Sequence, residues 1–197
     1  MLLPASTFRQ RHVKLLAGLG NPGRNYEGTR HNVGFDVLEI LARRCGSPVR
    51  RSRFQGETAQ VSIRGCPTLL LWPLTWMNLS GASVLAARDF YKIDPADILV
   101  ICDDFQLPTD TIRLRGSGSG GGQNGLADIL ARLGTNAIPR LRIGIGPVAA
   151  GWKTADFVLG GFSKAERTAI DVLLERAADA AEEWVALGIE AAMNRYN

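Results

Sequence analysis

The chain has 197 residues, of which 46% are hydrophobic and 21% are charged, and its formal net charge is +4. These values are typical of one globular domain with an ordinary core, and the mild basic charge is compatible with a nucleic-acid partner. No apolar run approaches the ~20 residues of a membrane helix, and three widely spaced cysteines exclude a zinc cluster and a disulfide framework.

The N-terminal segment lacks the apolar core of a signal peptide. We expect residues 1–12 to form a flexible N-terminal extension and residues 13–197 to form one folded domain. The cysteine usage favours a reducing cytoplasm.

Short apolar runs alternate with helical patterns along the chain. The segment 33–44, for example, places Val37, Leu38 and Leu41 on one face of a helix. We expect strands at 13–19, 58–63, 68–72, 98–102, 112–115 and 141–145, and helices at 33–44, 82–91, 126–133 and 164–197, the last interrupted at Gly188. This alternation predicts an α/β fold with a mostly parallel sheet.

His31 is the most informative residue of the sequence. The chain has two histidines, and His31 lies in a polar, glycine-rich loop just after the first predicted strand. Imidazole, with a reference pKa of about 6.5, is the side chain best suited to act as a base near neutral pH. A carboxylate would orient it, and Asp103 or its neighbour Asp104 follows another predicted strand. Adjacent strand residues point to opposite faces, so only one of the two aspartates can face the histidine.

The sequence argues against a serine or cysteine nucleophile. It has no GxSxG motif, and no cysteine lies in a loop beside a histidine. A water molecule activated by a base is the simpler chemistry. Loop amides can orient that water, bind substrate or stabilise an oxyanion, and four are candidates: Asn21, Asn32, Asn78 and Asn124.

Glycine-rich segments leave other interpretations open. Residues 18–23 match GxGxxG after a strand, which allows a dinucleotide-binding oxidoreductase or simply a tight turn. The glycine loop 116–125 can contact phosphate or act as a mobile lid. The spacing of Arg113 with Arg115, and of Arg140 with Arg142, would place each pair on one face of a strand, where it could hold a phosphate.

Six motifs in this order resemble those of bacterial-type peptidyl-tRNA hydrolases. They are GLGNPG at 18–23, TRHNVG at 29–34, TWMNLSG at 75–81, DDFQLP at 103–108, GGQNG at 121–125 and RLRIGIG at 140–146. The resemblance covers the chain from about residue 13 to its end. It implies a single three-layer α/β/α domain with a mixed, mostly parallel sheet, acting as a monomer on peptidyl-tRNA, without cofactor, metal or membrane.

The resemblance also assigns roles to individual residues. By similarity, His31 is the catalytic base, Asp103 supports it, and Asn21 engages the peptide near the scissile bond. The other matched positions bind substrate: the amides of Asn78 and Asn124, the site-lining Tyr26, Trp76 and Met77, and the phosphate-binding Arg115 and Arg142.

The chain departs from the family pattern at two of these motifs. Many members have histidine where this chain has Gln123, and phenylalanine or tyrosine is more usual than Trp76. The alternative to an enzyme is a catalytically silent RNA-binding relative of the same fold. The presence of His31, Asp103 and Asn21 favours the enzyme.

Overall fold

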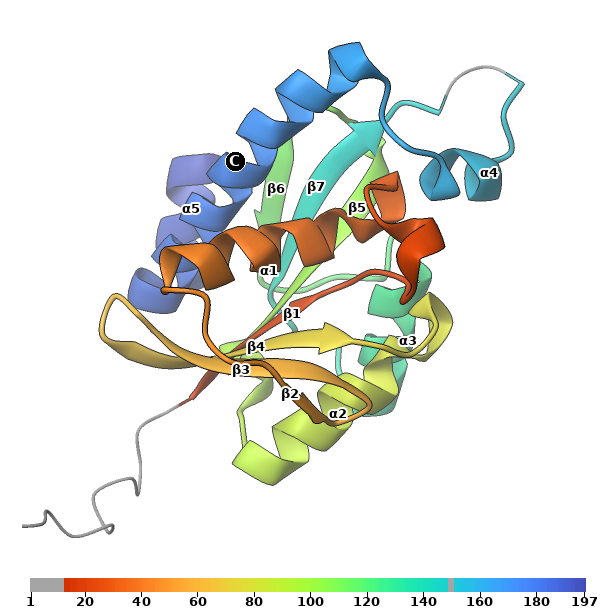
Figure 1. Cartoon of the computed structure of the whole chain (residues 1–197). Helices are drawn as coiled ribbons and strands as arrows, with labels where there is room; N and C mark the ends of the chain where they lie inside the picture. The colour runs from red at the N-terminus through yellow and green to blue at the C-terminus, as the bar shows by residue number, and fades with distance from the viewer. Residues whose placement is uncertain (1–12, 149–150) are drawn as a thin grey trace, which may run out of the picture.

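The computed structural model describes residues 13–148 and 151–197, so the predicted N-terminal extension lies outside the described residues. Its centre is a seven-stranded sheet with the order β2-β3-β4-β1-β5-β7-β6 (Figure 1). The strands are β1 (Lys14–Gly18), β2 (Arg51–Arg53), β3 (Gly56–Ile63), β4 (Cys66–Pro73), β5 (Ile98–Pro108), β6 (Ile112–Arg115) and β7 (Arg140–Gly146).

The sheet is parallel in the middle and antiparallel at its edges. β1 pairs in parallel with β4 and β5, and β5 pairs in parallel with β7. β3 and β2 continue one edge in antiparallel pairing, and β6 pairs antiparallel with β7 at the other. The prediction of a mixed sheet is therefore confirmed, and its parallel part is the centre formed by β4, β1, β5 and β7.

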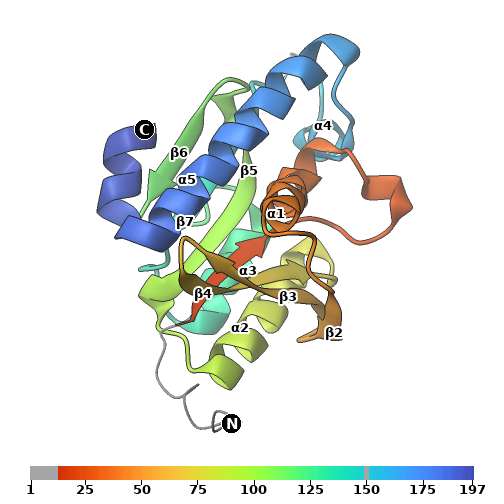
Figure 2. The same cartoon turned by 60° about the vertical axis from the view of Figure 1, so that its left-hand side comes forward.

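Helices cover both faces of the sheet. α1 (Val33–Arg44) and α5 (Lys164–Tyr196) pack on one face, and α2 (Ser80–Tyr91) and α3 (Asn124–Leu133) pack on the other (Figure 2). The short α4 (Thr154–Leu159) lies beside the loop that follows β1. This is the three-layer α/β/α arrangement that the sequence predicts.

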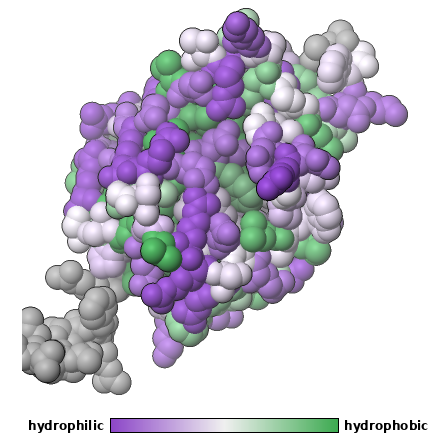
Figure 3. Space-filling view, in the orientation of Figure 1, coloured by the Kyte–Doolittle hydropathy of each residue, from purple (hydrophilic) through white to green (hydrophobic). Residues whose placement is uncertain are grey.

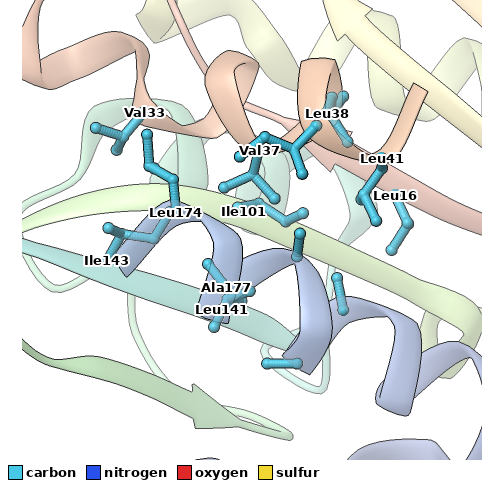
Figure 4. Close-up of a cluster of buried hydrophobic side chains, with 14 of the residues drawn as sticks. Leu16, Val33, Val37, Leu38, Leu41, Ile101, Leu141, Ile143, Leu174 and Ala177 are labelled. Atoms are coloured by element: carbon cyan, nitrogen blue, oxygen red, sulfur yellow. The ribbon is translucent and has the colours of Figure 1, made fainter. Parts of the chain in front are cut away.

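Successive side chains of the central strands point to opposite faces of the sheet and therefore form two separate cores. Leu16 and Ile101 face α1 and α5, whereas Leu15 and Val100 face α2 and α3. Figure 4 shows the first core, in which Val37, Leu38 and Leu41 of α1 meet the sheet and Leu174 and Ala177 of α5. The spacing that predicts α1 is thus the spacing of its buried face.

The outer surface over α1 and α5 is mainly hydrophilic, with scattered hydrophobic side chains (Figure 3). Within the two described ranges, no helix is long and apolar enough to cross a membrane.

The structure differs from the predicted elements in three places. β5 does not end at residue 102 but continues to Pro108, so Asp103 and Asp104 lie inside the strand. β2 and α4 have no counterpart among the predictions. The interruption expected at Gly188 is present, with φ 84° and ψ 180° inside α5.

Asp36, in the first turn of α1, destabilises the fold near neutral pH. Burial raises its pKa from 3.8 to about 6, although Arg167 lowers it and Glu39 and Asp171 add to the rise. Because folding raises the pKa of this carboxyl, its protonated form stabilises the native state at pH values below the pKa that the group has in the unfolded chain. This contribution is lost as the pH rises through 6, the pKa in the folded protein. Each unit of pKa difference between the folded and unfolded protein is worth about 1.4 kcal/mol, so ionised Asp36 lowers the free energy of unfolding by about 3 kcal/mol at neutral pH.

We therefore expect Asp36→Asn to raise the free energy of unfolding by up to about 3 kcal/mol at pH 7.5 and by much less at pH 4. The amide stays neutral at every pH, so it carries no cost of ionisation in a site where only 26% of the aspartate side chain is exposed. Urea denaturation of both proteins at the two pH values measures this difference. An equal effect at pH 4 and pH 7.5 contradicts the assignment of the cost to ionisation.

Candidate active site

The loop between β1 and α1 carries His31 and is held tightly against the sheet. It contains two short 3₁₀ turns, η2 (Arg24–Tyr26) and η3 (Arg30–Asn32). In the first turn of α1, Gly34 lets the helix approach β5, because a Cβ atom at this position would overlap the carbonyl oxygen of Ile101. This close approach fixes where His31 projects from the sheet.

Arg30 anchors the same loop to the C-terminal part of the chain. Its guanidinium is buried and donates to both carboxylate oxygens of Glu166, at 2.8 and 3.0 Å, and to the carbonyl of Gly161. It also lies over the rings of Phe157 and Phe162, with its Cζ atom 4.5 and 4.9 Å from the ring centroids. Arg30 therefore joins the histidine loop to α4 and to the start of α5.

A cavity of about 520 Å³ opens at the carboxyl ends of β1, β4 and β5, where open α/β sheets commonly bind ligands. Seven of the residues that the sequence predicts as functional line it: Asn21, His31, Trp76, Met77, Asn78, Asp103 and Asn124. They come from three separate loops and from β5. Among the described residues that line this cavity, His31 and Asp103 are the only titratable ones.

His31 and Asp103 are in contact inside this cavity. The Nδ1 atom of His31 lies 2.9 Å from Oδ2 of Asp103, and the two side chains are 12% and 2% exposed. The approach is not aligned as a hydrogen bond, so the contact is electrostatic in this arrangement. A carboxylate at this position stabilises a protonated imidazole, and it leaves Nε2, on the far side of the ring, free for chemistry.

Asp104 points away from the histidine, as the alternation of strand side chains requires. Its Oδ2 atom lies 2.6 Å from Nη2 of Arg142 on β7. Cys102, which precedes the two aspartates, is fully buried, and burial together with the nearby Asp103 charge raises the pKa of its thiol. Cys102 is therefore not a nucleophile for this site.

The three asparagines of the cavity differ in how firmly they are held. Asn21 is buried, and its Oδ1 atom accepts from the backbone N–H of Met77 at 2.9 Å, so its Nδ2 is the group left to meet a ligand. The side chain of Asn32 holds the backbone of Asn21: its Oδ1 accepts from the N–H of Asn21 at 2.9 Å, and its Nδ2 donates to the carbonyl of Asn21 at 3.0 Å. Asn78 and Asn124 are exposed at the starts of η4 (Met77–Leu79) and α3.

Three of the predicted residues do not line the cavity. Tyr26 is in edge contact with Trp76, which does line the cavity, at 6.0 Å between ring centroids. Arg115 and Arg142 lie on the antiparallel pair β6 and β7. Arg142 is paired with Asp104, so its charge is partly neutralised.

The cavity also contains residues to which sequence reasoning assigned no role. Phe105 belongs to the part of β5 beyond its predicted end, and Thr154, Val158 and Leu159 belong to the unpredicted α4. Gln123, noted in the sequence only as a departure from the family pattern, also lines it. Six residues are too few for a helical period to stand out, so no pattern in the sequence signals α4.

Two of the alternative interpretations are affected by the structure. The third glycine of GxGxxG does not open a helix, since α1 begins ten residues later at Val33. This contradicts the dinucleotide-binding arrangement, which needs the helix at that glycine. The segments that the structure covers hold no group of three or more histidine, cysteine, aspartate or glutamate residues suited to a metal ion.

Fold and cavity together define an α/β protein with a histidine–carboxylate pair in a cleft at the carboxyl ends of its parallel strands. A sequence profile of the family "Peptidyl-tRNA hydrolase" matches residues 15–197. The chain is 51% identical over 186 residues to peptidyl-tRNA hydrolase of Rhodopirellula baltica, covering 94% of this chain and 97% of the relative. It is 49% identical over 187 residues to the Chlorobaculum parvum protein of that name, covering 94% and 98%.

Solved structures agree with the sequence comparisons. The crystal structure of peptidyl-tRNA hydrolase from Acinetobacter baumannii superposes with a TM-score of 0.87 at 35% identity, covering 95% of this chain and 97% of that one. The chain belongs to the peptidyl-tRNA hydrolase family of enzymes.

Proposed function

We propose that this protein hydrolyses the ester bond that joins a peptide to the 3′-ribose of tRNA, with His31 as the base and Asp103 as its support. The observation that carries the proposal is the 2.9 Å contact between His31 Nδ1 and Asp103 Oδ2 inside the cavity. Family membership supports the same substrate.

The chemistry is a one-step hydrolysis by water. His31 Nε2 accepts a proton as the water oxygen bonds to the ester carbonyl, and Asp103 stabilises the imidazolium. The tetrahedral intermediate then collapses, the bond between the acyl carbon and O3′ breaks, and the imidazolium returns the proton to O3′. Free tRNA and a peptide with a new carboxylate leave the site.

The cavity residues supply substrate contacts for this reaction. The Nδ2 group of Asn21 faces the acyl group, and the amides of Asn78 and Asn124 position the substrate and stabilise the oxyanion. Tyr26, Trp76 and Met77 contact the terminal nucleotide and the peptide; Trp76, which is 55% exposed, offers a face for stacking.

The tRNA 5′-phosphate is proposed to meet Arg115 and Arg142. The register of β6 and β7 places Arg113 opposite Arg142 and Arg115 opposite Arg140, so the four arginines share one face of the sheet. Arg140 is committed to the carbonyls of Ile138, Ser119 and Asn136. Of the three arginines that remain, Arg115 and Arg142 are the pair that the resemblance to the family assigns to the phosphate. Charge-assisted bonds from two arginines are typical of phosphate sites.

A hydrolysis assay tests the function directly. We expect the protein to release free tRNA and N-acetyl-amino acid from N-acetyl-aminoacyl-tRNA, and to act far more slowly on the unblocked aminoacyl-tRNA. Tight tRNA binding without turnover would instead identify a catalytically silent RNA-binding relative. Both outcomes are read from one set of samples by acid gel electrophoresis and filter binding.

The pH dependence of the rate is the second expected result. Only the neutral form of imidazole can accept a proton from water, so we expect kcat/KM to rise with pH along a single limb between pH 5 and 8. Initial rates over this range, with substrate stability measured in parallel, give the profile. A rate that does not change with pH contradicts a histidine base.

The remaining properties follow from the same proposal. Residues 13–197 form the catalytic domain, which acts as a monomer in the cytoplasm, with peptidyl-tRNA as its partner and no metal or cofactor in the reaction. Gel filtration coupled to light scattering checks the monomeric state.

A further inference from the structure

Gln123 occupies an unusual position between the catalytic pair and α3. It is 7% exposed, and its Nε2 atom donates to Oδ1 of Asp103 at 3.0 Å and contacts the sulfur of Met77 at 3.2 Å. Its Oε1 atom accepts from the backbone N–H of Leu126 at 2.8 Å and so caps α3. The orientation of the amide is determined, because a backbone N–H can only donate and a carboxylate can only accept.

Each oxygen of the Asp103 carboxylate faces a different neighbour. One oxygen is held by Gln123, and the other faces His31 Nδ1. Among the hydrogen bonds of residues 13–148 and 151–197, no other side chain reaches this carboxylate. We propose that Gln123 is a positioning residue that holds Asp103 against His31, an inference that rests on the proposed function for its effect on the rate.

An amide suits this task because it donates at every pH and takes up no proton. The lining residues of η4, α3 and α4 are uncharged, so no further titratable group enters the cavity from these elements. The charged groups behind the pair are mostly committed elsewhere: Asp104 to Arg142, Arg30 to Glu166, and Arg140 to backbone carbonyls. Gln123 is therefore a neutral support for the contact between His31 and Asp103.

Two substitutions of Gln123 separate positioning from capping. Gln123→Glu keeps an oxygen that accepts from Leu126 N–H, but its ionised form cannot donate to Asp103. Gln123→Met has a similar length and loses both bonds. Gln60→Glu and Gln60→Met are the matched controls, because Gln60 is exposed on β3 and bonds to the Tyr91 hydroxyl.

If Gln123 positions Asp103, both variants lose activity although only one loses the cap. We expect kcat at pH 8 to fall between about 10-fold and 100-fold in each, with KM changed less than about threefold. The melting temperature should fall for Gln123→Met at every pH, and for Gln123→Glu mainly at high pH, where its ionised side chain lies against Asp103. The ratio of the Gln123→Glu rate to the wild-type rate should also decline as the pH rises from 5 to 8, because a protonated glutamate can still donate to Asp103.

The opposite pattern overturns the proposal. If Gln123 only caps α3, Gln123→Glu keeps the wild-type kcat and pH profile, and Gln123→Met loses stability without a specific loss of kcat. The Gln60 variants should match the wild type in every measurement.

Proton NMR of the imidazole rings tests the inference without any substrate. The chain has two histidines, so His12→Gln leaves His31 as the only ring to follow. In that background, ¹⁵N labelling shows which ring nitrogen of His31 carries the proton at pH 8, and we expect Gln123→Met to lower the share of the form protonated at Nδ1, because Asp103 turns away from that atom. An unchanged share means that Asp103 stays in place by itself and overturns the inference. Because this result needs no turnover, it remains decisive if the wild-type protein fails to hydrolyse peptidyl-tRNA.

Discussion

His31→Ala is expected to lower kcat by about 10²–10⁴-fold, the range that a positioned general base contributes. The tRNA affinity should change little, because the ring is only 12% exposed and the substrate contacts proposed here are made by other side chains of the cavity and its surroundings. Single-turnover hydrolysis of N-acetyl-aminoacyl-tRNA gives the rate, and filter binding with uncharged tRNA gives the affinity.

The chain provides a matched control in its only other histidine. His12→Ala should retain the wild-type rate, which separates the loss of this imidazole from the loss of any imidazole. Added free imidazole should partly restore the His31→Ala rate, because the vacated space opens onto a cavity of about 520 Å³. A His31→Ala variant that is folded and keeps more than about a tenth of the wild-type kcat excludes the base assignment.

The sequence predicts where the site lies because the fold follows from local patterns. The helical period at Val37, Leu38 and Leu41 is also the face that packs on the sheet, so the expected bounds of α1 match the structure. The parallel strands then bring the loops that follow β1 and β4 to one edge. His31, Asn78 and Asp103 line one cavity for this reason.

The sequence could not predict the interactions that depend on partners distant in the chain. Two consecutive carboxylates normally mark the exposed end of a strand, and the prediction therefore ended β5 at residue 102. In the structure Asp103 and Asp104 are buried inside β5, because His31 and Arg142 reach them from other elements. The spacing of Arg140 with Arg142 likewise gives no sign that Arg142 is paired with Asp104, so a phosphate bound there shares this guanidinium with the carboxylate.

The sequence also gives no sign of the part of the site that α4 forms. This helix is placed by Arg30, which precedes His31 in the chain and stacks on Phe157 of α4. A contact between residues more than a hundred positions apart leaves no periodic signal. Gln123 is a similar case, since only the structure brings its amide to Asp103.

Asp103→Asn is expected to be nearly as damaging as the loss of His31, with kcat lower by about 10²–10⁴-fold over the whole pH range. The reason is which atoms of the new amide face Gln123 and His31. Gln123 Nε2 can only donate, so the carbonyl oxygen of the new amide turns toward it and the NH₂ group turns toward His31. Nδ1 of the ring must then accept, Nε2 carries the proton, and the histidine can no longer take a proton from water.

Kinetics of single and double variants test this tautomer argument. Asp110→Asn, an exposed aspartate in the turn after β5, is the matched control and should keep the wild-type rate. In the double variant Asp103→Asn with Gln123→Met, nothing forces the amide to present its NH₂ group to His31. The double variant should therefore be no slower than Asp103→Asn alone, although Gln123→Met by itself slows the enzyme. Strictly additive losses, or an Asp103→Asn variant with more than a tenth of the wild-type kcat, would show that the carboxylate does not set the tautomer of His31.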